Sequence, residues 1–166
     1  MGASARQRKS RRILEKLLRS PVFRRSKHVM TYIAMHGEVE TRSLIAKSLA
    51  LKKHLYVPLV NRRTKEIKAL KIHHPVRDLR RGAYGILEPV RRRVKPADPA
   101  ALDLIVVPGL GFDRGGRRLG RGRGCFDRFL KKAKAAAKVG LAFREQIVRR
   151  IPTERHDVPV DRVITD

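Results

Sequence analysis

Residues 102–130 read LDLIVVPGLGFDRGGRRLGRGRGCFDRFL. The stretch opens with a continuous apolar run, residues 104–107, that Pro108 and Gly109 interrupt. Such a run is typical of a strand that is buried on both faces of a parallel sheet. We therefore predict a central strand here, followed by a loop that begins at Pro108.

This loop combines glycine with arginine. Seven glycines lie between Gly109 and Gly124, interleaved with arginines, and an apolar helix start follows at residues 125–130. Glycines let backbone N–H groups approach an oxyanion, a helix N-terminus adds about half a positive charge, and arginine donates two parallel hydrogen bonds to phosphate. The pattern predicts an anion-binding loop. A disordered basic tail is the alternative, but a buried-type strand and an apolar helix face flank the loop.

Composition limits the remaining possibilities. The chain has 166 residues, 41 Lys and Arg against 15 Asp and Glu, a formal charge of +26 and one cysteine. We expect a single domain over residues 1–166, a polyanionic ligand or partner, and no disulfide or cysteine-based zinc site. No apolar run is long enough to span a membrane. A reducing cytoplasm fits the single cysteine, and the Arg-rich start leaves organellar import as an alternative.

Strands and helices are expected to alternate along the chain. This alternation predicts an α/β fold, a three-layer, doubly wound and mostly parallel sheet. The helices are expected at residues 10–19 (capped by Ser10), from Thr41 or Arg42 onward, at 127–138 and at 144–150, and the strands at 28–34, 54–60, 66–72 (an edge strand), 102–107, 139–143 and 160–165, with 75–99 irregular.

Acidic residues stand out beside the predicted loops. Glu38 and Glu40 follow the first strand, Asp127 follows the glycine-rich loop, and Asp157 precedes the last strand. Carboxylates beside a phosphate site are candidate Mg2+ ligands. The alternative is that each of them pairs with a neighbouring arginine.

Several blocks, in order, resemble the 5-formyltetrahydrofolate cyclo-ligase family, also called methenyltetrahydrofolate synthetases. The blocks are PGLGFD (residues 108–113), RLGRGRG (118–124) with Asp127, YIAMHGEVET (32–41), GILEP (85–89), GLAF (140–143) with Gln146, and HDVPVD (156–161). The resemblance implies a fold of the NagB/RpiA/CoA-transferase-like type. It also implies ATP- and Mg2+-dependent conversion of 5-formyltetrahydrofolate to 5,10-methenyltetrahydrofolate, with release of ADP and phosphate.

The resemblance also implies roles for individual residues. ATP would be bound by residues 118–126, namely Arg118, Leu119, Gly120, Arg121, Gly122, Arg123, Gly124, Cys125 and Phe126. Arg121 and Arg123 would be catalytic, and Asp127 and Asp157 would hold the metal. The folate would contact Met35, Glu40 and residues 121–125, and Asp113 is expected to have no metal role.

The chain departs from the family pattern at several positions. Cys125 and Phe126 replace paired tyrosines, and Ile67-Lys68-Ala69 stands for a Met-x-Phe pattern. We expect the family's first helix, which helps to bind ATP, to be missing, with Arg6, Arg8 or Lys9 as substitutes. The alternative function is a divergent, non-catalytic member that binds nucleic acid through its basic surface. For the enzyme we expect a monomer that binds nucleic acid only weakly and without selectivity.

Overall fold

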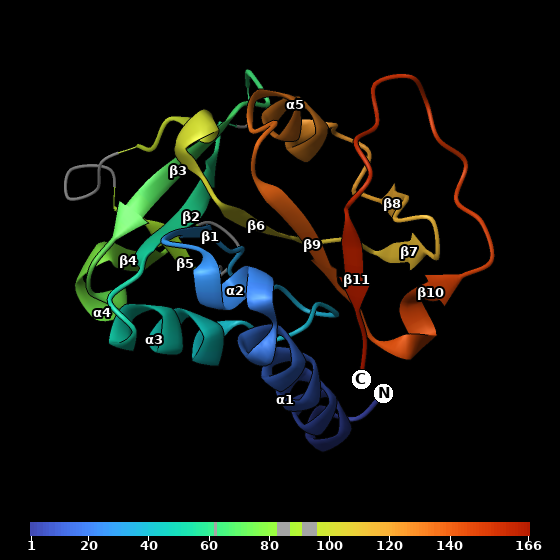
Figure 1. Cartoon of the computed structure of the whole chain (residues 1–166), viewed down its shortest axis with the longest axis horizontal. Coiled ribbons are helices and arrows are strands. Elements are labelled where there is room, and N and C mark those ends of the chain that lie inside the picture. The colour runs from blue at the N-terminus through green and yellow to red at the C-terminus, as the bar shows by residue number, and fades with distance from the viewer. Residues whose placement is uncertain (62, 83–86, 91–95) are drawn as a thin grey trace.

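A computed structural model of the chain describes residues 1–61, 63–82, 87–90 and 96–166. A six-stranded sheet with the order β11-β9-β6-β1-β2-β3 forms the centre of the molecule (Figure 1). All neighbouring strands are parallel except β2 and β3, which are antiparallel. The strands are β1 (His28–Met30), β2 (His54–Val60), β3 (Ile67–Ile72), β6 (Leu104–Val107), β9 (Ala137–Leu141) and β11 (Arg162–Ile164).

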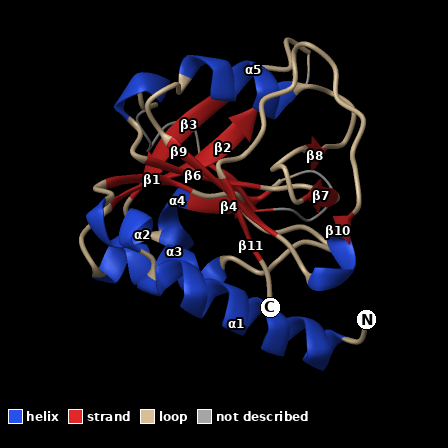
Figure 2. Ribbon diagram, turned by 45° about the vertical axis from the view of Figure 1, so that its right-hand side comes forward, coloured by secondary structure: helices blue, strands red, loops and turns tan. Residues whose placement is uncertain are grey.

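Helices cover both faces of this sheet, which gives three layers (Figure 2). One face carries α1 (Ala3–Arg19), α2 (Pro21–Arg25) and α3 (Arg42–Ala50), and the other carries α5 (Cys125–Lys132) beside the short helix η3 (Pro99–Ala101). The predicted α/β class, with a mostly parallel sheet, is confirmed.

The apolar sequence of the central strand β6 is explained by its burial. All four of its residues are buried. Leu104 and Val106 pack into the core under α1 and α3, whereas Ile105 and Val107 pack into the core under α5. Fully burying a side chain of this size stabilises the fold by about 1.5–3 kcal/mol. A strand between two helical layers therefore needs an apolar side chain at every position.

Smaller elements surround the sheet. On the right of Figure 1, a three-stranded sheet has the order β10-β7-β8. These strands are β7 (Gly111–Asp113), β8 (Arg118–Leu119) and β10 (Ile147–Val148), and η4 (Arg144–Gln146) precedes β10. On the left, α4 (Pro75–Asp78) leads into a hairpin of β4 (Leu79–Arg81) and β5 (Leu87–Pro89). Gly85 and Ile86 of the GILEP block lie outside the described residues.

The predicted boundaries of two helices were wrong. The first helix begins at Ala3, and Ser10 lies buried inside it, where its hydroxyl accepts a hydrogen bond from Glu40 N at 3.1 Å. The helix expected over residues 127–138 ends at Lys132. Strand β9 must begin at Ala137, because Ala137 pairs with Leu104 of the central strand.

Two further predicted elements are shorter in the structure than in the prediction. Strand β1 ends at Met30, and residues 31–34 form neither strand nor helix. The helix expected over residues 144–150 is only the short η4, followed by β10. Strand β10 forms because Ile147 pairs with Phe112 of β7, a contact between distant parts of the chain.

Candidate active site

The two loops predicted to bind ligand leave the same edge of the central sheet. Strands β1 and β6 are parallel neighbours, so residues 31–41 and 108–124 follow their adjacent carboxyl ends. The loops meet through Arg121, whose Nη2 lies 3.4 Å from Oε1 of Glu38. Open α/β sheets bind ligands at this edge. The contact joins the first acidic loop to the glycine-rich loop in one candidate site.

The loop after β1 is held by its own side chains. Met35 N donates to Glu38 Oε2 at 2.9 Å, and Gly37 between them has φ +86°. The buried Tyr32 hydroxyl donates to Val39 O at 3.0 Å. Burial, and secondarily the carboxylates of Glu38 and Glu40, raise the pKa of Tyr32 well above its usual value. The loop therefore presents Glu38 from a fixed backbone.

Glu40 faces a different direction from Glu38. Its Oε1 accepts from Arg42 N at 3.1 Å, in the first turn of α3. The Arg42 side chain lies 3.8 Å from the same oxygen. Both Met35 and Glu40 are half-buried. The sequence-based set named Glu40 for the folate, whereas Glu38 is the carboxylate that contacts the glycine-rich loop.

The start of the glycine-rich loop is fixed by packing and by one amide side chain. Phe112 is fully buried, and a Cβ built on Gly140 would lie 2.6 Å from its Cε1. Only glycine therefore fits at position 140 without a shift of Phe112. Gln146 Nε2 donates to Leu110 O at 3.2 Å, while its Oε1 accepts from Phe143 N. Gln146, part of the family-like blocks, thus holds the loop in place.

Asp113 has a structural role in the middle of this loop. It is 2% exposed, and its carboxylate accepts from the backbone N–H groups of Gly115, Arg117 and Ile151. Burial alone would raise the pKa of Asp113, but these hydrogen bonds and the Arg117 charge lower it below its ordinary value. Asp113 therefore stays ionised and shapes the turn.

Arg118 and Asp127 form a buried ion pair at the beginning of α5. Arg118 Nη2 lies 2.8 Å from Asp127 Oδ1, and the two side chains are only 6% and 11% exposed. Asp127 Oδ1 also accepts from Val158 N at 3.2 Å. Arg118 Nε is buried and has no hydrogen-bond partner among the described residues. A buried donor without a partner is costly, which marks the place where a ligand oxygen would be favoured.

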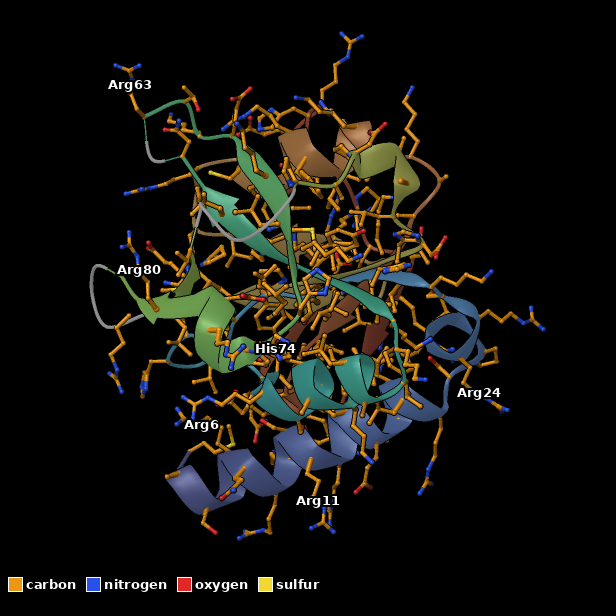
Figure 3. All side chains as sticks on the ribbon, turned by 90° about the vertical axis from the view of Figure 1, so that its left-hand side faces the viewer. Arg6, Arg11, Arg24, Arg63, His74 and Arg80 are labelled. Carbon is orange, nitrogen blue, oxygen red and sulfur yellow. The ribbon has the colours of Figure 1, made fainter. Side chains whose placement is uncertain are left out.

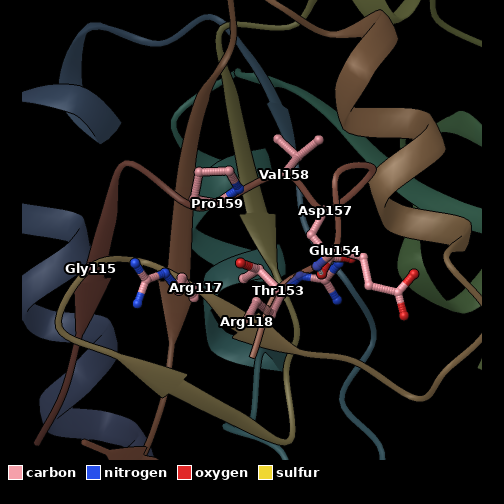
Figure 4. A pocket seen from close by; sticks show the side chains of 8 residues that line it. All are labelled: Gly115, Arg117, Arg118, Thr153, Glu154, Asp157, Val158 and Pro159. Atoms are coloured by element: carbon pink, nitrogen blue, oxygen red, sulfur yellow. Dashed lines mark hydrogen bonds between the residues drawn. The ribbon is translucent and has the colours of Figure 1, made fainter. Parts of the chain in front are cut away.

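A pocket of about 160 Å³ opens beside this ion pair. Figure 4 shows its side chains, which come from two segments. The lining residues are Gly115, Arg117, Arg118, Thr153, Glu154, Asp157, Val158 and Pro159. Asp157 Oδ2 accepts from Glu154 N at 2.8 Å. Arg118 and Val158 line the pocket with Asp157, and both contact Asp127, so the two aspartates lie near each other.

The other predicted site residues surround the helix start. Gly124 caps α5 with φ +58°, a left-handed conformation that glycine adopts without strain. Arg121, Gly122 and Arg123 are exposed, as is Leu119, while Gly120, Cys125 and Phe126 are half-buried. The Phe126 ring lies 5.9 Å from the Arg118 guanidinium. The predicted ATP loop thus offers buried Arg118 and two exposed arginines, Arg121 and Arg123.

Helix α1 contributes one cation to the site. Arg6 Nη1 lies 3.3 Å from Nδ1 of His36, in the loop that carries Glu38. Arg8 instead donates to Ser4, and Lys9 pairs with Glu145 and Asp166. Of Arg6, Arg8 and Lys9, the residues that we expected to help bind ATP, Arg6 is the one that reaches this loop.

Comparison with known proteins identifies the chain's relatives. The model of the 5-formyltetrahydrofolate cyclo-ligase family matches residues 1–166. The chain belongs to this family. It is 31% identical to mouse 5-formyltetrahydrofolate cyclo-ligase, with 99% of this chain and 85% of the mouse protein covered. It is 34% identical to the Arabidopsis thaliana protein named as mitochondrial, with coverages of 99% and 68%.

A solved structure supports the same assignment to the cyclo-ligase family. The 5,10-methenyltetrahydrofolate synthetase of Aquifex aeolicus is 38% identical and superposes with a TM-score of 0.86. The match covers 99% of this chain and 81% of the Aquifex chain. The resemblance inferred from the ordered blocks is therefore confirmed for family and fold.

Two departures from the cyclo-ligase pattern have clear positions in the structure. Ile67 and Ala69 are buried in the core with Phe129, so they fill space under α5. Cys125 Sγ has Arg123 O as its neighbour at 3.8 Å.

Among the described residues, no helix is long and apolar enough to cross a membrane.

Proposed function

We propose that this chain uses ATP to convert 5-formyltetrahydrofolate to 5,10-methenyltetrahydrofolate, releasing ADP and phosphate. One observation carries the proposal: the glycine-rich loop and the loop after β1 meet through Arg121 and Glu38, in a chain that the cyclo-ligase family model matches from end to end. The first loop has the groups that bind phosphates, and the second has the carboxylates that suit a heterocycle with N–H donors.

The chemistry consists of a phosphoryl transfer and a ring closure. The formyl oxygen of the substrate attacks the γ-phosphorus of ATP, and ADP leaves. The folate N10 then attacks the formyl carbon and releases its proton to solvent, and the C–O bond breaks with loss of inorganic phosphate. Phosphoryl transfer depends mainly on positioning and charge neutralisation. The loop of residues 118–126 supplies both through its arginines and its backbone N–H groups.

Within this loop the arginines have different roles. Arg121 and Arg123 are exposed and can follow the transferred phosphoryl group, so we assign them the catalytic role. Arg118 is held by Asp127, and its unpartnered Nε is available to one phosphate oxygen. The first turn of α5, after Gly124, adds N–H donors and the positive end of the helix dipole.

The folate would be recognised by the loop after β1. A carboxylate accepts hydrogen bonds from the N–H groups of a pterin ring. Glu38 is only 9% exposed and is fixed by Met35 N, so it is preorganised for this task together with Met35 and Glu40. Residues 121–125 would border the other side of the folate.

Asp127 and Asp157 fit a role in holding Mg2+. Each carboxylate uses one oxygen for its hydrogen bonds, Oδ1 in Asp127 and Oδ2 in Asp157. Among the described residues, the other oxygen of Asp157 has only a 3.8 Å contact with His156, and the other oxygen of Asp127 has no such contact. No cluster of three or more potential ligands occurs among the described residues, and Mg2+ commonly takes only one or two carboxylates together with phosphate oxygens. When bound, the ion would neutralise phosphate charge.

We further propose that the chain acts as a single-domain monomer in the cytoplasm. The name of the Arabidopsis relative leaves organellar import as the alternative. Light scattering after size-exclusion chromatography tests the monomer. A stable dimer at micromolar concentration would contradict it.

The direct test of the proposed function is formation of methenyltetrahydrofolate from 5-formyltetrahydrofolate and Mg-ATP, followed by its absorbance. We expect product formation that requires ATP and releases one phosphate for each product. Arg114→Ala is the matched control, because Arg114 is an exposed arginine of the same loop without a partner among the described residues. Arg121→Ala should lose activity, whereas Arg114→Ala should keep it.

A further inference from the structure

A second cavity lies at the edge of the sheet opposite the candidate active site. Its volume is about 330 Å³. His54 opens β2 and pairs with His28, so both residues lie where the parallel strands begin. Strand β3 runs antiparallel and returns to this edge, where Ile72 pairs with Leu55. We call this cavity the basic cleft, and it is lined by Leu49, Lys52, Lys53, His54, Lys71, Ile72, His73 and His74.

The lining of the basic cleft has cations and imidazoles but no acid. The Nζ atoms of Lys52 and Lys71 make no hydrogen bond or ion pair within the described residues. Lys53 is committed to the backbone, since its Nζ donates to Ser26 O at 2.5 Å and to Arg24 O at 3.2 Å. Two ammonium groups are therefore available to a ligand, one from the turn between α3 and β2 and one from β3.

Two acids beside the cleft, Asp78 and Asp103, accept hydrogen bonds from backbone amides. Asp78 accepts from the N–H groups of His73 and His74 at 2.7 and 2.9 Å. Asp103 accepts from those of Lys27 and His28 at 2.7 and 2.8 Å. Neither carboxylate lines the cavity. Both acids remain charged beside the cleft, but their hydrogen-bonded oxygens point to the backbone N–H groups, and neither pairs with the ammonium group of Lys52 or Lys71.

The imidazoles of the cleft lie close to one another and to the lysines. The rings of His28 and His54 lie 4.5 Å apart. Burial lowers the pKa of His54, and the charges of Lys71, His28 and His73 lower it further. Like charges collected on rigid elements repel one another, and a bound anion removes that repulsion. Figure 3 looks onto this face of the molecule, with His74 labelled beside α3 and α4.

We propose that the basic cleft is a second binding site for a phosphate group, separate from the proposed ATP site. Lys52 and Lys71 supply the ammonium donors, and His54, His73 and His74 supply imidazole donors around the same cavity. The phosphate can belong to a small phosphorylated compound or to the backbone of RNA, since the recognised chemistry is the same.

Amide NMR with inorganic pyrophosphate tests this proposal, because it resolves the two sites separately. The amide signals of Lys52, His54, Lys71, His73 and His74 should shift together and saturate with one dissociation constant. The pKa of His54 should rise when pyrophosphate is bound, because the anion offsets its cationic neighbours. Shifts of Gly120, Gly122 and Gly124 report the proposed ATP site, so failure of one site is distinguishable from failure of the other.

A charge-matched pair of variants adds the control. Lys52→Gln/Lys71→Gln should weaken binding at the cleft by about tenfold or more, which is the effect of losing charge-assisted hydrogen bonds. Lys131→Gln/Lys132→Gln removes the same charge from exposed positions of α5 and should leave it unchanged. A short uridine oligonucleotide forms the second arm, and saturation there with none by pyrophosphate would assign the phosphate to RNA. The proposal is overturned if neither probe saturates the cleft, or if both variant pairs weaken binding equally.

Discussion

Replacing Arg118 by alanine should cost much more stability than replacing Arg121 by alanine. Arg118 and Asp127 form a 2.8 Å pair with side chains 6% and 11% exposed, so Arg118→Ala leaves a buried carboxylate with only the Val158 N–H. Breaking such a pair costs about 3–5 kcal/mol. Arg121 is 50% exposed and lies 3.4 Å from Glu38, so its loss should cost at most about 1 kcal/mol of the free energy of unfolding.

Nucleotide binding should respond in both variants. Each arginine is expected to donate a charge-assisted hydrogen bond to ATP, worth about 1.5–3 kcal/mol of binding free energy. Urea denaturation gives the stability of each variant, and calorimetry with Mg-ATP gives its affinity. Equal stability losses in the two variants would refute the buried-pair argument. Unchanged affinity in Arg121→Ala would refute the assignment of the loop to ATP.

Three further predictions concern acids and packing. Asp127→Asn and Asp157→Asn should each raise the Mg2+ concentration needed for half-maximal rate, and an unchanged Mg2+ dependence would remove the metal role. The pKa of Asp113 is lowered in the folded state from an ordinary value of 3.8, so its contribution to stability is present above that pH and disappears as the pH falls through the lowered value. Urea midpoints should therefore fall less in Asp113→Asn than in the parent between pH 5 and about pH 3, and parallel curves would contradict this. Gly140→Ala places a Cβ 2.6 Å from Phe112 and should cost about 1–3 kcal/mol in urea unfolding, partly restored by Phe112→Leu; no loss would show that the ring moves freely.

The central sheet could be predicted from the sequence because its strands have uniform surroundings. The apolar run of β6 follows directly from burial on two faces. Strand β3 was predicted from its alternating sequence, although its buried residues Ile67 and Ile72 belong to the cores on opposite faces of the sheet. The region after Lys132 could not be predicted in the same way. Lysine and alanine favour helix, yet the pairing of Ala137 with Leu104 decides the structure there. Tertiary pairing overrides local propensity at this point.

The candidate site shows a similar division. The glycines, arginines and acids indicated a phosphate site, and motif order identified the family. Contacts between distant residues were not predictable from the sequence. The sequence left open whether Asp127 binds a metal or pairs with an arginine such as Arg118. The choice between Glu38 and Glu40 depends on which side chain turns toward Arg121. The two glutamates are two residues apart and have the same chemistry. Their contacts distinguish them: Glu38 accepts from Met35 N and faces Arg121, whereas Glu40 accepts from Arg42 N.

The central claim is that the Arg121-bearing loop transfers phosphate from ATP to a formyl-folate. The most direct measurement is the rate of methenyltetrahydrofolate formation by the purified chain with Mg-ATP and 5-formyltetrahydrofolate, with the Arg121→Ala and Arg114→Ala variants in parallel. The account predicts ATP-dependent product with the parent protein and Arg114→Ala, and a rate lower by at least about tenfold with Arg121→Ala. No product from a folded parent protein, or equal rates in all three proteins, would contradict it.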